Sequence, residues 1–458
     1  MKKILFILAG TLVLAGCKSY KNYERPQSIE DTAKEQLFRD VQGTDTMSFG
    51  NMPWREVFTD AQLQQLIEKA LAQNTDLQKA DHNIQKARIG LKVSKLSYLP
   101  TLAVAPQGQI ASFDGGKATK TYTLPLSLSW ELGSWGSLRN NRKKAGVDTL
   151  IAASAKQATQ TAIVSAVANL YYTMQMLDEQ LRTTNETVVL WKKNVDAMEA
   201  MQQAGLTTNA AVAQARANFY ELQTTVPTLE HSIRQTENAL CVILNEAPHA
   251  IARAAFNADA FPADFSTGVP LQLLSSRPDV KIAELQLASA FYNTNIARSA
   301  FYPSLTLSGT AGWTNSAGSM VLNPAKFIAN AVGSLVQPLF AQGKLRAQYK
   351  IAKIEQESLT LDFRNTLLSA GQEVSDALSA YQTAIAKAEK RQLEVEQLEQ
   401  ALDKTLFLFS HGNTTSYLET LTAQQSLLSA KLSLISDKYD KLQAGISLYQ
   451  ALGGGRDK

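Results

Sequence analysis

The sequence contains one pattern twice, and this repetition limits the possible folds more than any other feature. In each copy a helix-forming segment ends at a proline, alternating residues follow, and a glycine precedes a second helix-forming segment. The proline follows an aspartate by 24 positions in both copies, and two pairs of glycines are 207 positions apart. Matched spacings of this kind predict two copies of one unit. The matched pairs are Asp76 with Asp279, Pro100 with Pro303, Gly136 with Gly343, and Gly205 with Gly412.

The alternating segments predict β-hairpins. Residues 101–110 and 121–130 have apolar side chains at every second position and small polar side chains such as Ser127 and Ser129 between them. The second copy predicts strands at 304–313 and 329–339 around a Gly, Ser and Asn loop. A half-buried hairpin on a soluble core is one interpretation. Strands of about ten residues with aromatic residues at both ends of the apolar face favour membrane-spanning strands. The predicted apolar row is Tyr122, Leu124, Leu126, Leu128 and Trp130.

Two very long helices follow the hairpins, at about 137–204 and 343–410. At 1.5 Å per residue, about 68 residues form a helix roughly 100 Å long. The returning helices are expected to end near Leu244 and Leu452, the first of them interrupted and kinked at Pro227. A seven-residue apolar period predicts coiled-coil packing. Its main row is Leu367, Val374, Tyr381, Ala388, Val395, Leu402 and Phe409, and a weaker companion row is Leu378, Ile385 and Leu406.

Four strands are too few for a closed barrel. About eight strands form the smallest barrel whose interior side chains fit, and an open sheet edge in lipid leaves backbone groups unpaired. If these strands cross a membrane, several chains must therefore share one barrel. The small polar strand residues would then face a wet lumen.

The N-terminus has the features of a bacterial export signal. Residues 1–16 contain two lysines, a short apolar run and small residues, and the string ending at Cys17 resembles a lipobox, in which the cysteine receives a diacylglyceryl group. The alternative is a cysteine beside an ordinary cleavage site. Residues 17–53 are polar and aperiodic, and we interpret them as a tether. Cys241 then remains as a single thiol, which excludes a disulfide framework.

Catalytic and nucleic-acid-binding signatures are missing from the sequence. The 45 basic and 41 acidic residues nearly balance without long blocks of one sign, which argues against a nucleic-acid partner. The four histidines lack metal-ligand spacing, and no nucleophile elbow, phosphate loop or dinucleotide fingerprint is present. We therefore expect no enzyme activity and no cofactor. Methionines on the long helix, such as Met174 and Met198, are expected to pack, and Gly453-Gly454-Gly455 is expected to be a frayed end.

Several motifs resemble those of the TolC-like outer-membrane efflux channels, in particular the lipoprotein branch of resistance-nodulation-division systems. The resemblance covers nearly the whole mature chain. Its motifs are Phe261-Pro262, Gly268-Val269-Pro270, Leu273-Leu274-Ser275-Ser276-Arg277-Pro278-Asp279-Val280, Phe301-Tyr302-Pro303-Ser304-Leu305, His411-Gly412-Asn413-Thr414-Thr415-Ser416-Tyr417-Leu418 and Leu448-Tyr449-Gln450-Ala451-Leu452-Gly453-Gly454-Gly455.

The resemblance implies an α+β membrane protein that forms a homotrimer, with a 12-stranded β-barrel continuous with a helical tunnel. It also implies a periplasmic adaptor protein, an inner-membrane pump and location in the outer membrane, extending into the periplasm. The channel would be a passive duct for drugs or other toxic small molecules.

The resemblance also implies a constricted entrance at the helical tips. These tips are Gly205 and, in the second hairpin, Gly412, Tyr417, Leu418, Glu419 and Thr422. Leu418 matches a ring of leucines that closes the entrance. Many members have an aspartate where this chain has Thr422 and an acidic residue where it has Ala211, so Glu419 is the nearest carboxylate. Glu419 is equally compatible with a solvated helix position.

The expected divisions are a signal peptide (1–16), a tether (17–53), repeat one (54–248), a linker (249–270), repeat two (271–452) and a tail (453–458). Within the repeats the helical hairpins are expected at about 137–246 and 343–452. Two other functions remain open. One is the outer-membrane channel of a type I protein secretion system, and the other is a structural coiled-coil lipoprotein that forms no pore.

Overall fold

The structure is a computed structural model that describes residues 20–34, 49–112, 114–132, 136–261, 277–317, 320–410 and 417–455. Two compact units divide it. Unit 1 comprises residues 1–32, 82–154 and 281–365, and unit 2 comprises residues 33–81, 155–280 and 366–458. Several long helices contribute one part to each unit.

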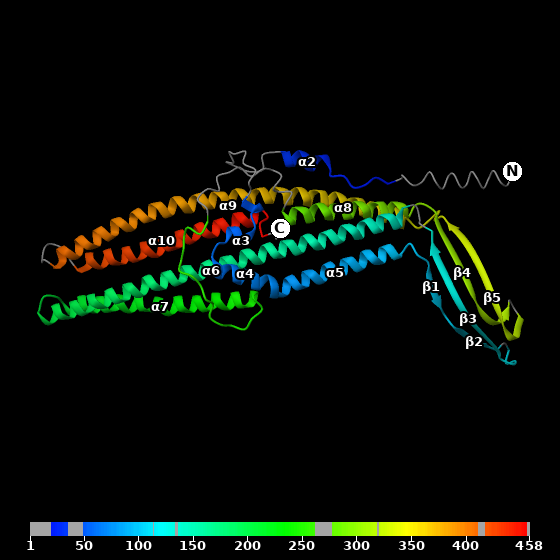
Figure 1. The fold of residues 1–458 in the computed structure, drawn as a ribbon, viewed down its shortest axis with the longest axis horizontal. Coiled ribbons are helices and arrows are strands. Elements are labelled where there is room, and N and C mark those ends of the chain that lie inside the picture. Colours follow the sequence, from blue (N-terminus) through cyan, green and yellow to red (C-terminus); the bar gives the residue numbers. More distant parts are fainter. Residues whose placement is uncertain are drawn as a thin grey trace. The chain divides into compact units, whose positions relative to one another are not determined.

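Unit 1 contains an antiparallel sheet of the order β1-β3-β4-β5, with β2 also paired to β3 (Figure 1). The strands are β1 (Thr101–Val104), β2 (Gln107–Ala111), β3 (Thr119–Glu131), β4 (Ser304–Ala317) and β5 (Met320–Val336). Strands β1 and β2 pair with successive parts of β3 in the same register, since Val104 pairs with Leu126 and Gln107 pairs with Thr123. The two short strands therefore occupy one strand position in the sheet. The gap between them contains Pro106, which lacks a backbone N–H for the ladder.

The second hairpin differs from the sequence-based expectation. Strand β5 runs from Met320 to Val336, so the predicted strand is confirmed at 329–336, but its start and the long loop before it are wrong. Polar side chains that we interpreted as a loop bond across the ladder instead. Asn315 accepts a hydrogen bond from the backbone N–H of Tyr122 (2.7 Å) and donates to the Lys120 carbonyl (2.9 Å). Such bonds let a Ser- and Asn-rich sequence remain in a strand.

The register places the predicted apolar row of β3 on one face of the sheet, because directly paired residues share a face. Leu124 pairs with Trp313, and Leu126 pairs with Ala311. The same face continues on β5, where Phe327 pairs with Trp313 and their rings contact edge to face. Most of these apolar side chains are exposed in the single chain.

Residues 20–32 belong to unit 1 and pack against its helix α8 (Pro278–Ser299). Arg25 donates two hydrogen bonds to the Glu284 carboxylate on α8, at 2.9 and 2.7 Å, and Tyr23 meets the Phe291 ring edge to face. Helix α2 (Gln27–Lys34) buries Ile29. Side-chain contacts therefore hold this part of the predicted tether against α8, which its polar, aperiodic sequence did not indicate.

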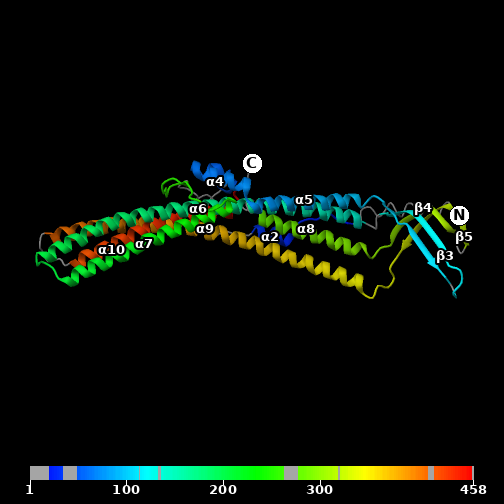
Figure 2. The same ribbon diagram turned by 90° about the horizontal axis from the view of Figure 1, so that it is seen from below.

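Unit 2 is built mainly from helices. Helices α6 and α7 form one helical hairpin, and α9 and α10 form another. In Figures 1 and 2 the two helices of each hairpin run alongside each other. The matched lengths are 67 residues for α6 and α9 and 35 residues for α7 and α10. The bounds are α3 (Trp54–Val57), α4 (Ala61–Gln73), α5 (Thr75–Leu96), α6 (Ser137–Gln203), α7 (Asn209–Ile243), α9 (Lys344–Ser410) and α10 (Tyr417–Ala451).

Short-range signals explain where the helices begin and end. Asp60 caps α4 by accepting from the N–H groups of Gln62 and Leu63, and Asn74 ends α4 and caps α5. The expected interruption at Pro227 is wrong, since α7 runs through this residue as one helix. The packed face of α7 on both sides of the proline offsets the loss of one backbone hydrogen bond.

The main heptad row of α9 is confirmed for its first members. Leu367, Val374 and Tyr381 are buried in unit 2, as is Val395 further along the helix. The expected companion row is wrong. The buried companions are Phe363, Ala370, Ala377 and Ala384, whereas Leu378 and Ile385 are only partly buried. Alanine contributes little to the hydrophobic periodicity of a sequence, so this row was not recognised. Its small side chain nevertheless lets two helices approach closely.

The glycines at the end of the chain pack in the core of unit 2, so the expected frayed end is wrong for residues 453–455. Thr161 donates a 2.6 Å hydrogen bond to the Gly454 carbonyl, and the Gly455 N–H donates to the Tyr449 hydroxyl at 2.8 Å. A side chain at Gly454 would place its Cβ 2.5 Å from the Tyr449 ring. Rings of Phe49, Phe58 and Phe261 surround this site.

None of the helices in the described ranges combines the length and apolar character needed to cross a membrane.

Candidate functional site

The first hairpin turns sharply at Gly205. Its φ of +75° is a left-handed conformation that favours glycine. The Leu206 N–H donates to the Met201 carbonyl (2.8 Å) and the Gly205 N–H to the Gln202 carbonyl (2.9 Å), which ends α6 in a Schellman motif. Thr208 then caps α7 by accepting from the Ala211 N–H at 3.2 Å. Gly205 therefore defines this tip, and Ala211 lies in the first turn of α7.

The second hairpin places three of the predicted entrance residues on one exposed face of α10. Leu418 is 66% exposed, and Glu419 and Thr422 are exposed beside it. The Thr422 hydroxyl donates to the Leu418 carbonyl at 2.8 Å, so it bonds within its own helix. Gly412 lies outside the described residues. A large apolar side chain held in water at a helix start is energetically unfavourable for an isolated chain.

Tyr417 lies on the opposite side of the first turn of α10. Its ring is 6.3 Å from the Phe409 ring, and burial raises the pKa of its hydroxyl. Both rings pack against a cluster between α6 and α7, which fixes the second tip to the first hairpin. This tip cluster consists of Trp191, Val195, Met198, Val212, Ala215, Phe219 and Leu222. Thus Tyr417 is a packing residue, while Leu418 remains exposed.

A cluster of charged side chains joins α9 to α10 further along the hairpin from its tip. Asp437 is buried on α10, and Lys387 and Arg391 on α9 contact its carboxylate at 2.7 and 3.1 Å. Burial alone would raise the pKa of this carboxyl, but the hydrogen bonds and charges of Lys387 and Arg391 outweigh burial and leave its pKa below the usual value. Sequence reasoning missed this cluster, because its members are about 50 positions apart and have no motif.

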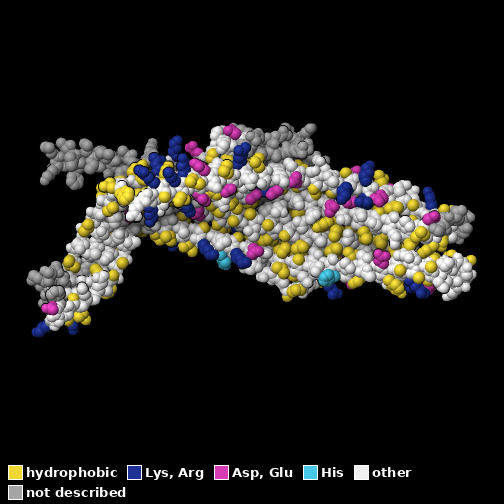
Figure 3. Space-filling model, turned by 180° about the vertical axis from the view of Figure 1, so that it is seen from behind, with side chains coloured by type: hydrophobic (Ala, Val, Ile, Leu, Met, Phe, Trp, Pro, Cys, Tyr) yellow, Lys and Arg dark blue, Asp and Glu magenta, His cyan; other side chains and the backbone are white. Residues whose placement is uncertain are grey.

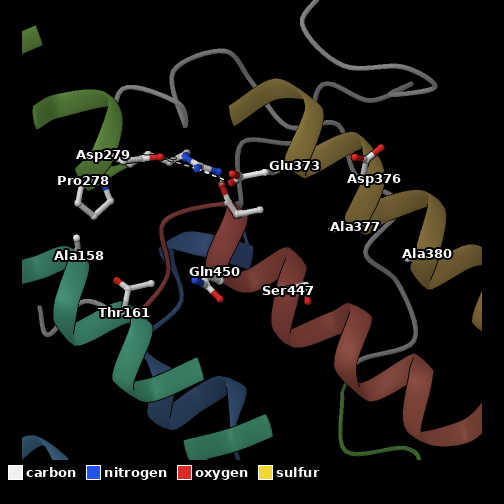
Figure 4. A pocket seen from close by; sticks show the side chains of 12 residues that line it. Ala158, Thr161, Pro278, Asp279, Glu373, Asp376, Ala377, Ala380, Ser447 and Gln450 are labelled. Atoms are coloured by element: carbon white, nitrogen blue, oxygen red, sulfur yellow. Dashed lines mark hydrogen bonds and ion pairs between the residues drawn. The ribbon is translucent and has the colours of Figure 1, made fainter. Parts of the chain in front are cut away.

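Arg277 connects the start of α8 to α9 and α10 at a pocket of about 620 Å³ (Figure 4). Its guanidinium contacts Asp279 at 2.7 Å and Glu373 of α9 at 2.6 Å. A further N–H donates to the carbonyl of Ala451, the last residue of α10, at 2.7 Å. Arginine suits this position because its five donors reach several acceptors from a fixed plane. The Arg-Pro-Asp motif was visible in the sequence, but its structural role was not.

The other candidates are placed as follows. Cys17 lies outside the described residues. The Cys241 thiol is buried 3.5 Å from Nδ1 of His249, and Met174 and Met198 are buried in packing positions. Within the described part of the chain, no group of three histidine, cysteine or acidic residues could hold a metal ion.

Comparison with known proteins gives consistent matches over nearly the whole chain. The family model for "outer membrane efflux protein" matches residues 66–246 and 269–454. The cation efflux system protein CusC of Escherichia coli K12 is 28% identical over 447 residues, 97% of each chain. The toluene efflux pump outer membrane protein TtgC of Pseudomonas putida is 28% identical over 471 residues, covering 99% of this chain and 96% of TtgC.

Solved structures agree with the sequence matches. A crystal structure of CusC has a TM-score of 0.85 and 27% identity, and the match covers 95% of this chain and 99% of that one. The open state of the MtrE channel of Neisseria gonorrhoeae has the same fold, with a TM-score of 0.83 and 24% identity over 95% of this chain and 98% of that one. The chain therefore belongs to the outer membrane efflux protein family and is an outer-membrane channel of an efflux system.

Proposed function

We propose that this chain is the exit duct of a tripartite efflux pump, formed by three copies of the chain. The sheet of unit 1 carries this proposal, because in the part of the chain that the structure describes its outer strands β1 and β5 each pair on one side only. Both edges of an apolar-faced sheet are then open, which is unfavourable in lipid. Pairing β5 of one copy with β1 and β2 of the next keeps the antiparallel alternation. Because β1 and β2 share one strand position beside β3, each copy would contribute four strands, and three copies would close a barrel of 12.

The distribution of side chains supports this assembly. Leu102, Val104 and Leu126 share the exposed apolar face, which would contact lipid. Ser127 and Thr310 pair on the opposite face, which would line a polar lumen. The helical hairpins would form the tunnel below, with Leu418 narrowing its entrance. The duct itself would use no energy.

The matched helix lengths support two structural repeats. Repeat one would be 54–248 and repeat two 271–452, joined by the linker 249–270.

We further propose that Cys17 is lipidated and anchors the N-terminus to the outer membrane. SilC of Salmonella typhimurium, which is 28% identical over 458 residues, is described as a probable outer membrane lipoprotein.

An inner-membrane transporter of the resistance-nodulation-division class and a periplasmic adaptor would be the partners. The relatives named for cation efflux and for toluene efflux are equally similar to this chain, at 28% identity each. Similarity alone therefore does not select among drugs, solvents and metal ions. The packing positions of Met174 and Met198 favour drugs or other toxic small molecules over a methionine-lined metal path.

Conductance in planar bilayers, combined with chemical crosslinking, tests the proposal. The purified protein should form discrete pores and crosslink to a trimer that dissociates on heating. A soluble monomer without conductance would favour the structural lipoprotein. A type I secretion channel would also conduct, so a second measurement is needed. Deletion of the gene should sensitise cells to small toxic compounds, and loss of a secreted protein without such sensitivity would favour type I secretion.

A further inference from the structure

A basic pocket of about 460 Å³ lies in unit 1, where α5 leads into β1 and β3 leads into α6. Four cations line it, namely Lys95 of α5 and Arg139, Arg142 and Lys143 of α6. The residues of α6 are three or four positions apart and therefore occupy one helix face. Leu91 and Lys95 of α5 line the facing side, together with Tyr98, which follows the end of α5. We call this the junction pocket.

Three of the four cations in the junction pocket lack an acidic partner in the described part of the chain. Among the described residues, no carboxylate lies within ion-pair distance of Lys95, Arg142 or Lys143. Lys143 contacts the amide of Asn22 and lies 5.5 Å from the Tyr292 ring. Its pKa is lowered by burial and by the charge of Arg139. A bound anion would relieve this repulsion.

The surroundings of the pocket are those of a membrane surface. Tyr98 is only three positions before the first residue of β1, and its carbonyl accepts a 3.0 Å hydrogen bond from the Trp130 indole near the end of β3. Aromatic side chains with a polar edge concentrate at the headgroup level of membrane proteins. Figure 3 shows basic side chains gathered where the helices of this unit meet the sheet. The neighbouring Leu99 and Leu102 are exposed and apolar.

We propose that the junction pocket binds the phosphate group of an anionic phospholipid from the periplasmic leaflet of the outer membrane. The inference rests on the proposed function, since it needs the sheet to span that membrane. Lys95, Arg142 and Lys143 contact the phosphate oxygens, and Tyr98 and Leu91 contact the glycerol and the first acyl carbons. Such a lipid would hold each β-hairpin at a defined depth in the bilayer.

Gly146 permits a test that leaves the cations in place. It lines the junction pocket near the start of α6, and a Cβ added there meets no neighbouring heavy atom within 4 Å. Gly146→Glu introduces a carboxylate into the pocket, and Gly146→Gln is its uncharged control of the same size. Both changes replace a helix-interior glycine and favour the helix, so both variants are expected to fold.

The probes are phosphatidylglycerol and phosphatidylcholine, titrated onto the delipidated full-length protein in detergent and counted by native mass spectrometry. Wild type and Gly146→Gln should retain phosphatidylglycerol in preference to phosphatidylcholine. One charge at an anionic surface corresponds to about 1 kcal/mol, or roughly fivefold in affinity, so Gly146→Glu should lose about fivefold. Equal retention by the Gln and Glu variants would overturn the proposal.

A variant in which three cations of the pocket are replaced tests the same lipid affinity independently. The variant Lys95→Gln, Arg142→Gln and Lys143→Gln should lose roughly 100-fold in affinity for phosphatidylglycerol, at about fivefold per charge. The matched control, Arg234→Gln, Lys390→Gln and Lys404→Gln, removes the same charge from exposed positions outside the pocket and should leave binding unchanged. A comparable loss in this control would mean that only the net charge matters, which contradicts a specific pocket.

Three outcomes separate the possible causes. Displacement of the lipid by excess inorganic phosphate would identify a site for free phosphate and overturn the lipid assignment. Dissociation of trimers in the same spectra would show that the cations contact a neighbouring chain instead. Conductance of the same samples distinguishes the two proposals. Normal pores without lipid preference would refute the junction pocket alone, whereas no pores in the wild type would refute the proposed function.

Discussion

Placing a charge on the apolar face of the sheet should prevent stable insertion, and Leu126→Arg is the sharpest such change. Strand β3 has 13 residues, so at about 3.3 Å per residue it is roughly 43 Å long. With a tilt of about 40°, it would rise about 33 Å across the bilayer, enough for the apolar band of a membrane barrel. Leu126 is one residue beyond the centre of the strand and would lie within about 3 Å of the midplane.

The expected cost follows from this depth. Arginine facing lipid at the midplane costs about 2 to 4 kcal/mol, which gives roughly 6 to 12 kcal/mol for three copies. Leu126 is 46% exposed in the single chain and pairs with Val104 and Ala311 on the same face, so nearby groups offer no countercharge. Ser127→Arg is the matched control, because the next residue points to the opposite face, where a wet lumen should tolerate the charge.

Urea unfolding of protein inserted in lipid vesicles, followed by tryptophan fluorescence, measures the difference. The Leu126→Arg variant should unfold at a markedly lower urea concentration than wild type, and Ser127→Arg should stay within about 0.5 kcal/mol. The reverse order would show that the lipid and lumen faces are inverted. Unchanged unfolding of both variants would refute insertion of the sheet.

Four further predictions concern the anchor, the entrance and the core. Cys17→Ser should abolish acyl labelling in cells, and persistent labelling would refute lipidation at this residue. Leu418→Ala should widen the entrance and increase uptake of large antibiotics, whereas unchanged uptake would place the constriction elsewhere. The pKa of Asp437 is lowered in the folded state, so this carboxylate stabilises the fold above a pH of about 4, and the stabilisation is lost as the pH falls through the folded-state pKa. The thermal unfolding temperature, measured by circular dichroism, should therefore depend more strongly on pH below 5 in wild type than in Asp437→Asn. Gly454→Ala should cost about 1 to 3 kcal/mol in chemical unfolding, because its Cβ meets a buried aromatic ring, while Gly90→Ala, with no atom nearby, should be neutral or stabilising.

Local chemistry explains why most element boundaries were predictable. Helices α5 and α8 end shortly before Pro100 and Pro303, and strands β1 and β4 begin directly after them, because the residue before a proline disfavours the helical conformation. Gly136 and Gly343 adopt φ values of +93° and +77°, which favour glycine over other residues. These signals act within a few residues and are therefore readable in sequence. The long helices carry a repeating apolar row that needs no knowledge of distant contacts.

The features that we missed depend on contacts between distant residues. Arg277 and the carbonyl of Ala451 are separated by 174 positions, and no local pattern joins them. The buried alanines of α9 lack the hydrophobic contrast that reveals a heptad. Strand β5 was placed too late because its first residues look like a loop, and only pairing with β4 makes them a strand. We predicted the entrance residues from the family resemblance. The single chain shows that Leu418 is exposed, whereas a ring of leucines needs several chains.

The burial of Gly454 and Gly455 makes the end of the chain a condition for completing its core. A secreted protein leaves the translocation machinery with its N-terminus first, so Thr161 and Tyr449 wait for the final residues before their hydrogen bonds can form. Until these two bonds form, Gly454 and Gly455 cannot fill their places in the core of unit 2. A chain that stops before Gly454 would therefore lack both hydrogen bonds that hold this part of the core together.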